Sequence, residues 1–194
     1  MEIIPAILTS DVKELDDLLR QIRDSKKFDR VQIDFIDGEY ATNKTFKPME
    51  VDVVPYTPLK FDAHLMVTEN YIIEWSVMAQ KFGFDRIIAQ LESISRPQDF
   101  TSLALDYHSP VAAIRKYLPK LELVVVMAVE PGFGGQHFVE AVKQDIQDLV
   151  KLRQERHFAY RICVDGGIEQ EHLQMLQDLG VDEVAVGAKR VISW

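Results

Sequence analysis

Short apolar runs recur along the whole chain and are separated by more polar segments. The runs are rich in Ile and Val and have the length of buried strands. Most of the polar segments between them place apolar residues at helical spacing, as Val142, Ile146 and Leu149 do. The predicted strands cover residues 3–8, 31–36, 61–67, 86–92, 101–107, 123–129, 160–166 and 181–187.

Strands and helices that alternate from one end of a chain to the other favour parallel pairing with right-handed crossovers. Eight such strands are the number that closes a (β/α)₈ TIM barrel, so the sequence predicts an α/β barrel of this type. The length of 194 residues favours one domain over residues 1–194. An open, doubly wound sheet is the main alternative.

The alternation is incomplete at two places. Only residues 93–100 separate the fourth and fifth predicted strands, which is too short for an ordinary crossover helix. After the eighth strand only residues 188–194 remain, so the last helix is expected to be truncated. We expect two neighbouring, thinly covered barrel faces and, because exposed apolar surface favours association, a homo-oligomer.

The net charge of −9 argues against binding of nucleic acid, which requires many cationic contacts to phosphates. A small anionic substrate is compatible with this charge, because backbone N–H groups can bind a phosphate locally. Cys163 is the only cysteine and has no partner for an internal disulfide. The first residues contain no signal-peptide pattern and no run is long enough to span a membrane, so a cytoplasmic protein is expected.

Polar residues interrupt the apolar runs near the carboxyl ends of three predicted strands. Asp34 and Asp37 end the second strand, His64 the third and Asp165 the seventh. Each has an ordinary structural explanation, and Asp37 in particular precedes a glycine as turn-forming aspartates do. The carboxyl ends of barrel strands meet at one mouth, however, and carboxylates buried together with an imidazole need a metal or hydrogen-bonding partners. The pattern therefore predicts a functional site at the mouth of the barrel, formed by these polar residues.

Glycine-bearing loops follow the sixth, seventh and eighth predicted strands. Any one of these loops is explained by a tight turn, but three adjacent loops can direct N–H groups at one phosphate. A phosphate site after strands seven and eight is typical of this barrel class. These loops are residues 131–136, 164–167 and 186–189.

Five segments of this sequence resemble the ribulose-phosphate 3-epimerase family, in the same order and spacing. They are IIPAILTSD, VQIDFIDGEYATN, FDAHLMV, VVVMAVEPGFGGQHF and ICVDGGI, and the resemblance extends over about residues 3–190. It implies a (β/α)₈ barrel that interconverts ribulose 5-phosphate and xylulose 5-phosphate by moving one proton at C3. It also implies a divalent metal cofactor, which could be Zn, Fe, Mn or Mg.

The resemblance also assigns roles to individual residues. It makes Asp34 and Asp165 the catalytic acid and base as well as metal ligands, and His64 a further ligand. Gln32 stands where the family has a second metal-binding histidine, and an amide oxygen favours a harder ion than imidazole does. The residues that the resemblance places around the substrate are Ala6, Met66 and Met127. The phosphate-binding residues that it implies are Gly134, Gly135, Gly166, Gly167, Gly187 and Ala188.

Other positions differ from the family pattern and leave alternatives open. Ala6 and Ala188 replace serines, Ile36 replaces a methionine, and Gln90 replaces a histidine. The chain could therefore act on another ketose phosphate, such as allulose 6-phosphate, or bind a sugar phosphate without turnover. A lyase or decarboxylase of the same barrel group is disfavoured, because residues 31–38 and 61–67 contain no lysine among their acidic residues.

Overall fold

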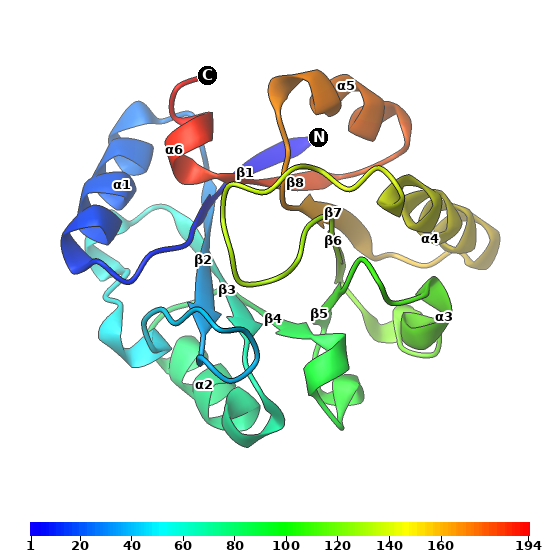
Figure 1. Ribbon diagram of the computed structural model, residues 1–194, viewed down its shortest axis with the longest axis horizontal. Helices are drawn as coiled ribbons and strands as arrows, with labels where there is room; N and C mark the ends of the chain where they lie inside the picture. The colour runs from blue at the N-terminus through cyan, green and yellow to red at the C-terminus, as the bar shows by residue number, and fades with distance from the viewer.

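The computed structural model describes residues 1–194 and contains a closed barrel of eight parallel strands. The strands pair in chain order, and pairing of the first with the last closes the ring, with helices outside it (Figure 1). The predicted (β/α)₈ barrel is confirmed and the open sheet is excluded. The strands are β1 (Glu2–Ile7), β2 (Arg30–Ile36), β3 (Lys60–Met66), β4 (Arg86–Gln90), β5 (Ser102–Leu105), β6 (Leu123–Met127), β7 (Arg161–Asp165) and β8 (Glu183–Gly187).

The helices outside the barrel are very unequal in length. The short ones, α3 (Val111–Ile114) and α6 (Ala188–Val191), have four residues each. None of the helices has the length and apolar character needed to cross a bilayer. The longer helices are α1 (Val12–Ser25), α2 (Glu69–Lys81), α4 (Val142–Arg156) and α5 (Gln170–Asp178).

The sequence determines both ends of α1 and the face that it buries. The Asp11 carboxylate accepts hydrogen bonds from the backbone N–H groups of Lys13 and Glu14, at 2.8 and 3.1 Å, and so caps the first turn. The helix ends at Lys26, which adopts the left-handed conformation. Between these ends, the residues that α1 buries recur at helical spacing and are Leu15, Leu18, Leu19 and Ile22.

The two irregularities that the sequence indicated are present. Two 3₁₀ turns, Leu91–Ser93 and Pro97–Asp99, replace a helix between β4 and β5, and the four-residue α6 follows β8. The expectation that the two thin faces are neighbours was wrong, because four strand positions separate them around the closed ring. The homo-oligomer stays a prediction.

The connection between β2 and β3 also lacks an α-helix, which the sequence analysis did not anticipate. Only two 3₁₀ turns, Pro48–Glu50 and Val54–Tyr56, form there. Pro55 and Pro58 lack the N–H groups that a continuing helix would need. Side chains from this segment nevertheless cover the barrel, because Phe46, Val51, Val53 and Tyr56 are buried in the main core.

Side chains alternate between the outside and the inside of the barrel along each strand. On β3, Phe61, Ala63 and Leu65 pack outward into the main core of 45 buried residues, whereas Asp62 and His64 face the interior. A smaller apolar cluster fills part of that interior, and the unpaired thiol of Cys163 is buried in it. Its members are Ile88, Ala104, Leu123, Val125, Met127, Cys163 and Ala185.

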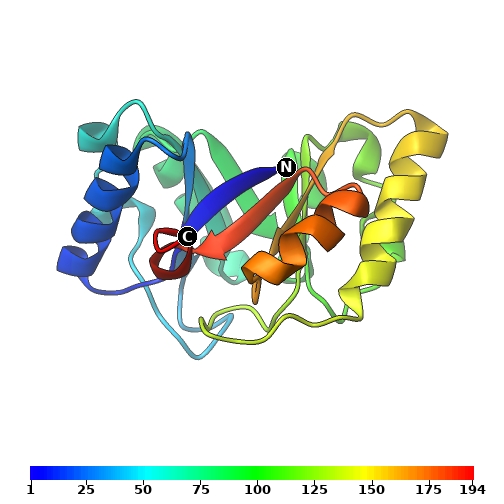
Figure 2. The ribbon, with the colours of Figure 1, turned by 90° about the horizontal axis from the view of Figure 1, so that it is seen from above.

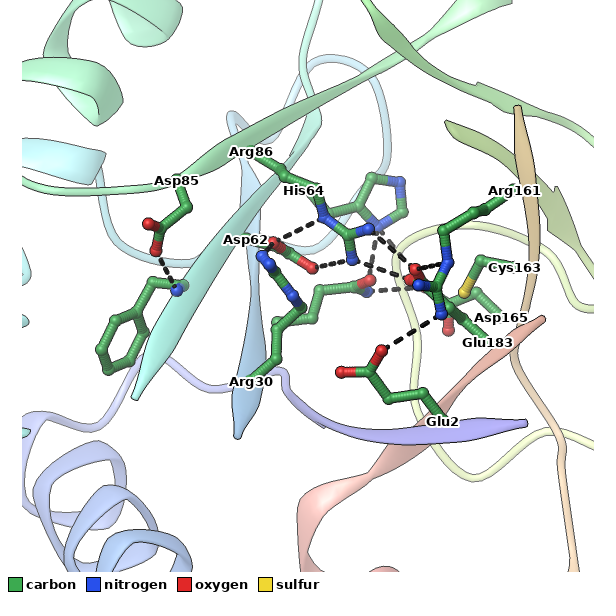
Figure 3. A network of polar contacts seen from close by, with 12 residues as sticks. Glu2, Arg30, Asp62, His64, Asp85, Arg86, Arg161, Cys163, Asp165 and Glu183 are labelled. Carbon is green, nitrogen blue, oxygen red and sulfur yellow. Dashed lines mark hydrogen bonds and ion pairs between the residues drawn. The ribbon is translucent and has the colours of Figure 1, made fainter. Parts of the chain in front are cut away.

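A buried ion network occupies the amino-terminal end of the barrel interior (Figure 3). Arg86 donates to Asp62 at 2.5 and 2.9 Å and to Glu183 at 2.8 and 3.0 Å. Arg30 also contacts Asp62, and Arg161 contacts Glu183. Burial opposes the charge of Arg86, but its hydrogen bonds to the two carboxylates outweigh burial and raise the pKa of the guanidinium.

Replacement of Arg86 by Met is expected to lower the free energy of unfolding by about 3–5 kcal/mol, because two buried carboxylates lose their shared partner. Urea unfolding followed by circular dichroism would measure the loss. Arg161→Met is the control, since the Arg161 side chain is 49% exposed and its removal should cost about 1 kcal/mol or less. Equal losses for both variants would contradict the role assigned to Arg86.

Candidate active site

Three strands bring Asp34, His64 and Asp165 together inside the barrel. Asp34 and His64 are register partners on β2 and β3, and Asp165 ends β7. The Nδ1 atom of His64 lies 3.2 Å from Oδ1 of Asp34 and 3.6 Å from Oδ2 of Asp165. One ligand atom from each residue lies within 4.8 Å of the others, which is close enough for all three to contact one metal ion. The convergence that the sequence indicated is therefore present.

Gln32 lies two residues before Asp34 on β2, and its side chain contacts the cluster of Asp34, His64 and Asp165 from the amino-terminal side of the barrel interior. Its amide nitrogen donates to Oδ1 of Asp34 at 2.9 Å and to Oδ2 of Asp165 at 2.7 Å. The same nitrogen lies 3.4 Å from Nδ1 of His64. The amide thus joins the two carboxylates, a contact that the linear sequence did not indicate.

Asp37 does not join this cluster. Its carboxylate accepts from the backbone N–H groups of Glu39, Tyr40 and Thr68 at 2.7–2.8 Å. Burial opposes its charge, but these hydrogen bonds outweigh burial and lower the pKa of Asp37. The turn-forming interpretation of Asp37 is the one that the contacts support.

Burial and the charges and hydrogen bonds of neighbouring groups determine the pKa values of Asp165 and His64. Burial, and after it the charge of Asp34, raise the pKa of Asp165 to about 6, although His64 and Gln32 act in the opposite direction. Burial lowers the pKa of His64, but the hydrogen bond to Asp34 and the two carboxylate charges outweigh it and raise that pKa. Asp165 therefore keeps its proton to a higher pH than an ordinary aspartate does.

A cavity of about 540 Å³ opens above the cluster. Its lining includes the cluster residues and all of the residues that the sequence analysis placed around a substrate and a phosphate, but not Gln32. Asn43, Lys189 and Arg190 also line it, and the sequence analysis missed them. The basic pair directly after the last glycine loop was the signal that could have found two of them. The predicted residues in the lining are Ala6, Met66, Met127, Gly134, Gly135, Gly166, Gly167, Gly187 and Ala188.

The glycine loops pack tightly against one another. A Cβ atom on Gly167 would lie 2.3 Å from the backbone nitrogen of Phe138, and Gly167 has a φ of +67°. Any other residue there would collide with the backbone of the β6 loop. The N–H groups of Gly134, Gly135, Gly166 and Gly167 make no hydrogen bond within the chain. These donors line the cavity and are available to an anion.

Two long loops project beyond the same end of the barrel (Figure 2). The loop after β6 crosses the mouth in Figure 1, and the loop after β2 meets it. The Asn43 side chain donates to the carbonyl oxygen of Gly132 at 2.9 Å. A Cβ atom on Gly132, whose φ is +104°, would lie 2.5 Å from Cβ of Ala41. The two loops are thus in direct contact over the cavity.

Comparison with known proteins identifies the family. The model of the ribulose-phosphate 3 epimerase family matches residues 2–191. The chain belongs to the ribulose-phosphate 3-epimerase family. Similar relatives are the ribulose-phosphate 3-epimerases of Treponema pallidum (strain Nichols), 32% identical over 95% of this chain and 88% of that protein, and of Bacillus subtilis (strain 168), 30% identical over 97% and 91%.

Solved structures of other proteins share the fold. A tryptophan synthase complex from Pyrococcus furiosus matches with a TM-score of 0.63 at 13% identity, over 99% of this chain and 88% of that one. The putative copper homeostasis protein CutC of Streptococcus agalactiae matches with a TM-score of 0.59 at 13% identity, over 94% and 97%. At such identities these matches support the barrel architecture alone.

Some of the residues that differ from the family pattern line the cavity, and others are buried away from it. Ala6 and Ala188 line the cavity, so two hydroxyl groups are missing from its wall. Ile36 is fully buried and does not line the cavity. Gln32 and Gln90 lie beneath the cavity, and both contact His64. The two glutamines therefore change the surroundings of the imidazole rather than the wall that a substrate would touch.

Replacement of Asp165 by Asn is expected to stabilise the metal-free protein at pH 8 but not at pH 4. The folded pKa of about 6 exceeds the ordinary value, so the contribution of this carboxyl to stability is present at low pH and lost as the pH rises through 6. If the loss of the buried carboxylate charge stabilises the folded protein by about 1 kcal/mol, the Tm would rise by ~2–4 °C. Calorimetry in EDTA at both pH values tests this, with the exposed Asp17→Asn as control. A lower Tm for Asp165→Asn at pH 8 would contradict the expectation.

Proposed function

We propose that this protein interconverts ribulose 5-phosphate and xylulose 5-phosphate by transferring a proton at C3 between Asp34 and Asp165. The observation that carries the proposal is that two carboxylates from β2 and β7 lie beneath one cavity whose wall also contains the glycine loops. Membership of the family, and the activity named for its relatives, support the same reaction. The proposed substrate is thus a small ketose phosphate.

The two carboxylates suit acid and base roles. Epimerisation requires a base on one side of the substrate carbon and an acid on the other, and positioned groups of this kind contribute ~10²–10⁴ in rate. Burial raises the pKa of Asp165 to about 6 in the metal-free protein, which brings this carboxyl closer to neutral pH than an ordinary aspartate. In one direction Asp34 removes the proton and Asp165 returns one, and in the reverse direction the two residues exchange roles. Met66 and Met127 border the reacting carbon as apolar walls.

The donor set fits a divalent metal ion. Two carboxylate oxygens and the Nδ1 atom of His64 are ligand types that Mn²⁺, Fe²⁺ and Zn²⁺ accept, and they lie within 4.8 Å of one another. Asp34, His64 and Asp165 would hold the ion, and Gln32 would add its amide oxygen after a turn of the side chain. The ion would supply positive charge that stabilises the negative charge developing on the substrate carbonyl oxygen. An amide in the place of an imidazole favours Mn²⁺ or Mg²⁺ over Zn²⁺.

The substrate phosphate is proposed to bind at the glycine loops. Gly134, Gly135, Gly166 and Gly167 offer N–H groups that have no partner within the chain. Gly187 and Ala188 border the same cavity, as does Lys189, which pairs with Glu14. The wall there is therefore rich in donors although the whole chain carries a net charge of −9. Such a phosphate site would orient the sugar with its reacting carbon near the two carboxylates.

Exchange of the C3 proton tests the catalytic assignment. Ribulose 5-phosphate in D₂O is followed by NMR with Mn²⁺, Zn²⁺, Fe²⁺ or EDTA. The wild-type protein should incorporate deuterium at C3, and Asp34→Asn and Asp165→Asn should each lower the rate at least ~10²-fold, because each removes one proton-transfer group. Asp17→Asn, an exposed change of the same kind, should keep the wild-type rate.

The absence of exchange with every metal, together with retained binding of the sugar phosphate, would support a binding protein without turnover. Exchange with allulose 6-phosphate but not with ribulose 5-phosphate would move the proposal to another ketose phosphate. Exchange that survives both aspartate changes would remove Asp34 and Asp165 from the catalytic roles.

Gln32→His is expected to tighten Zn²⁺ binding at least ~10-fold, since imidazole is a better zinc ligand than an amide. Gln32→Leu should weaken Mn²⁺ binding, because it offers no oxygen. Isothermal titration calorimetry at constant pH measures both dissociation constants. Zinc affinity that is the same in wild type and Gln32→His would place Gln32 outside the coordination sphere.

A further inference from the structure

The two ring nitrogens of His64 face two different environments. Nδ1 points to the carboxylates of Asp34 and Asp165, at 3.2 and 3.6 Å. The amide nitrogen of Gln32 lies 3.4 Å from Nδ1, but its N–H groups donate to these two carboxylates. Nε2 points away from them, and its one hydrogen-bonding neighbour is the side-chain amide of Gln90, at 3.0 Å (His64 in Figure 3). The imidazole is 1% exposed, so these side chains are its principal hydrogen-bonding partners. Whatever Gln90 presents to Nε2 therefore influences which ring nitrogen carries the proton.

Gln90 ends β4 and is fully buried. Its amide nitrogen faces Nε2 of His64, whereas its amide oxygen is the only buried side-chain polar atom in the chain without a hydrogen-bonding partner. The contact with His64 is the only hydrogen bond of this amide. The amide can therefore turn by 180° and exchange its oxygen and nitrogen without breaking a bond to any third residue.

The two orientations of this amide favour two different neutral tautomers of the His64 imidazole. With the nitrogen toward the ring, Gln90 donates to an unprotonated Nε2, so the proton is on Nδ1 and is directed at Asp34. With the oxygen toward the ring, Gln90 accepts from a protonated Nε2, so Nδ1 has a free lone pair. Only the second imidazole can bind a metal through Nδ1, because a ligating nitrogen carries no proton.

We propose that Gln90 is a positioning residue that decides which nitrogen of His64 carries the proton, and that its amide turns over when a divalent metal binds at Nδ1. The proposal rests on the proposed function of this site. It explains why an amide is suitable at this position, since a carboxylate can only accept and an ammonium group can only donate. Gln90 itself does not line the cavity, so it acts through His64 and not on the substrate.

Nitrogen-15 NMR of the histidine rings tests the proposal without any assay of activity. The wild-type protein is compared in EDTA and with Zn²⁺, at a pH above the raised pKa of His64 so that the metal-free ring is neutral. The His64 signals are assigned by their loss in His64→Gln. We expect a proton on Nδ1 in EDTA and on Nε2 with Zn²⁺. In Gln90→Met, which has a similar length but no donor or acceptor, the proton in EDTA should be distributed over both nitrogens. The Zn²⁺ dissociation constant of this variant should rise ~10–100-fold.

Gln90→Glu separates hydrogen bonding from packing, because it keeps the shape and can accept. It should show Nε2 protonated already in EDTA and should bind Zn²⁺ at least as tightly as the wild type. A wild-type protein in EDTA with Nε2 protonated would overturn the proposal. An unchanged proton distribution and Zn²⁺ affinity in both variants would also overturn it.

The proposed function can fail separately from this inference. If the wild-type protein binds none of Zn²⁺, Mn²⁺, Fe²⁺ and Mg²⁺, the metal-dependent reaction fails, while the spectra in EDTA still decide whether Gln90 controls the imidazole. If the spectra behave as expected but C3 exchange is absent, the positioning role stands and the epimerase activity does not. If Gln90→Met does not fold, the wild type and Gln90→Glu carry the test.

Discussion

The interior of an eight-stranded barrel has room only for side chains, so every second residue of each strand must share that space. In this protein much of the shared space is given to polar groups. Along β3 the interior receives Asp62, then His64, and then Met66 at the cavity. Three layers thus follow one another along β3. Asp62 belongs to the ionic layer, His64 to the layer of the proposed chemistry, and Met66 to the wall of the substrate cavity. Each polar layer is stable only because its charges find partners within the barrel.

The two polar layers meet this requirement differently. Asp62, Arg86 and Glu183 satisfy one another with fixed hydrogen bonds, so that layer is complete in itself. The layer above contains two carboxylates, an imidazole and an amide that bridges them, and the pKa of Asp165 remains raised. A lower layer whose charges are all paired, beneath an upper layer that is less completely satisfied, suits a reaction centre, because the lower layer supports the groups that would exchange protons or bind a ligand.

The strands and the convergence of Asp34, His64 and Asp165 were predictable from sequence, because both depend on local hydrophobic runs and on the rule that parallel strands end at one mouth. The helix-free segment between β2 and β3 was harder to foresee, since the apolar residues Val51, Val53 and Tyr56 do not reveal whether helix or irregular chain will bury them. The bridge made by Gln32 depends on distances across the barrel, which periodicity does not contain. The ionic layer could have been inferred from the sequence, because charged residues stand near the starts of β3, β4 and β8. They are Asp62, Arg86 and Glu183.

The contact between the loops after β2 and β6 links two parts of the sequence that lie far apart. Gly132 has a φ of +104° and lies against Cβ of Ala41, so it has no room for a side chain. Asn43 donates to the carbonyl oxygen of the same glycine. Neither loop can therefore be redesigned alone. An attempt to reshape the cavity for a longer or shorter sugar by grafting loops would have to transfer both loops as a matched pair.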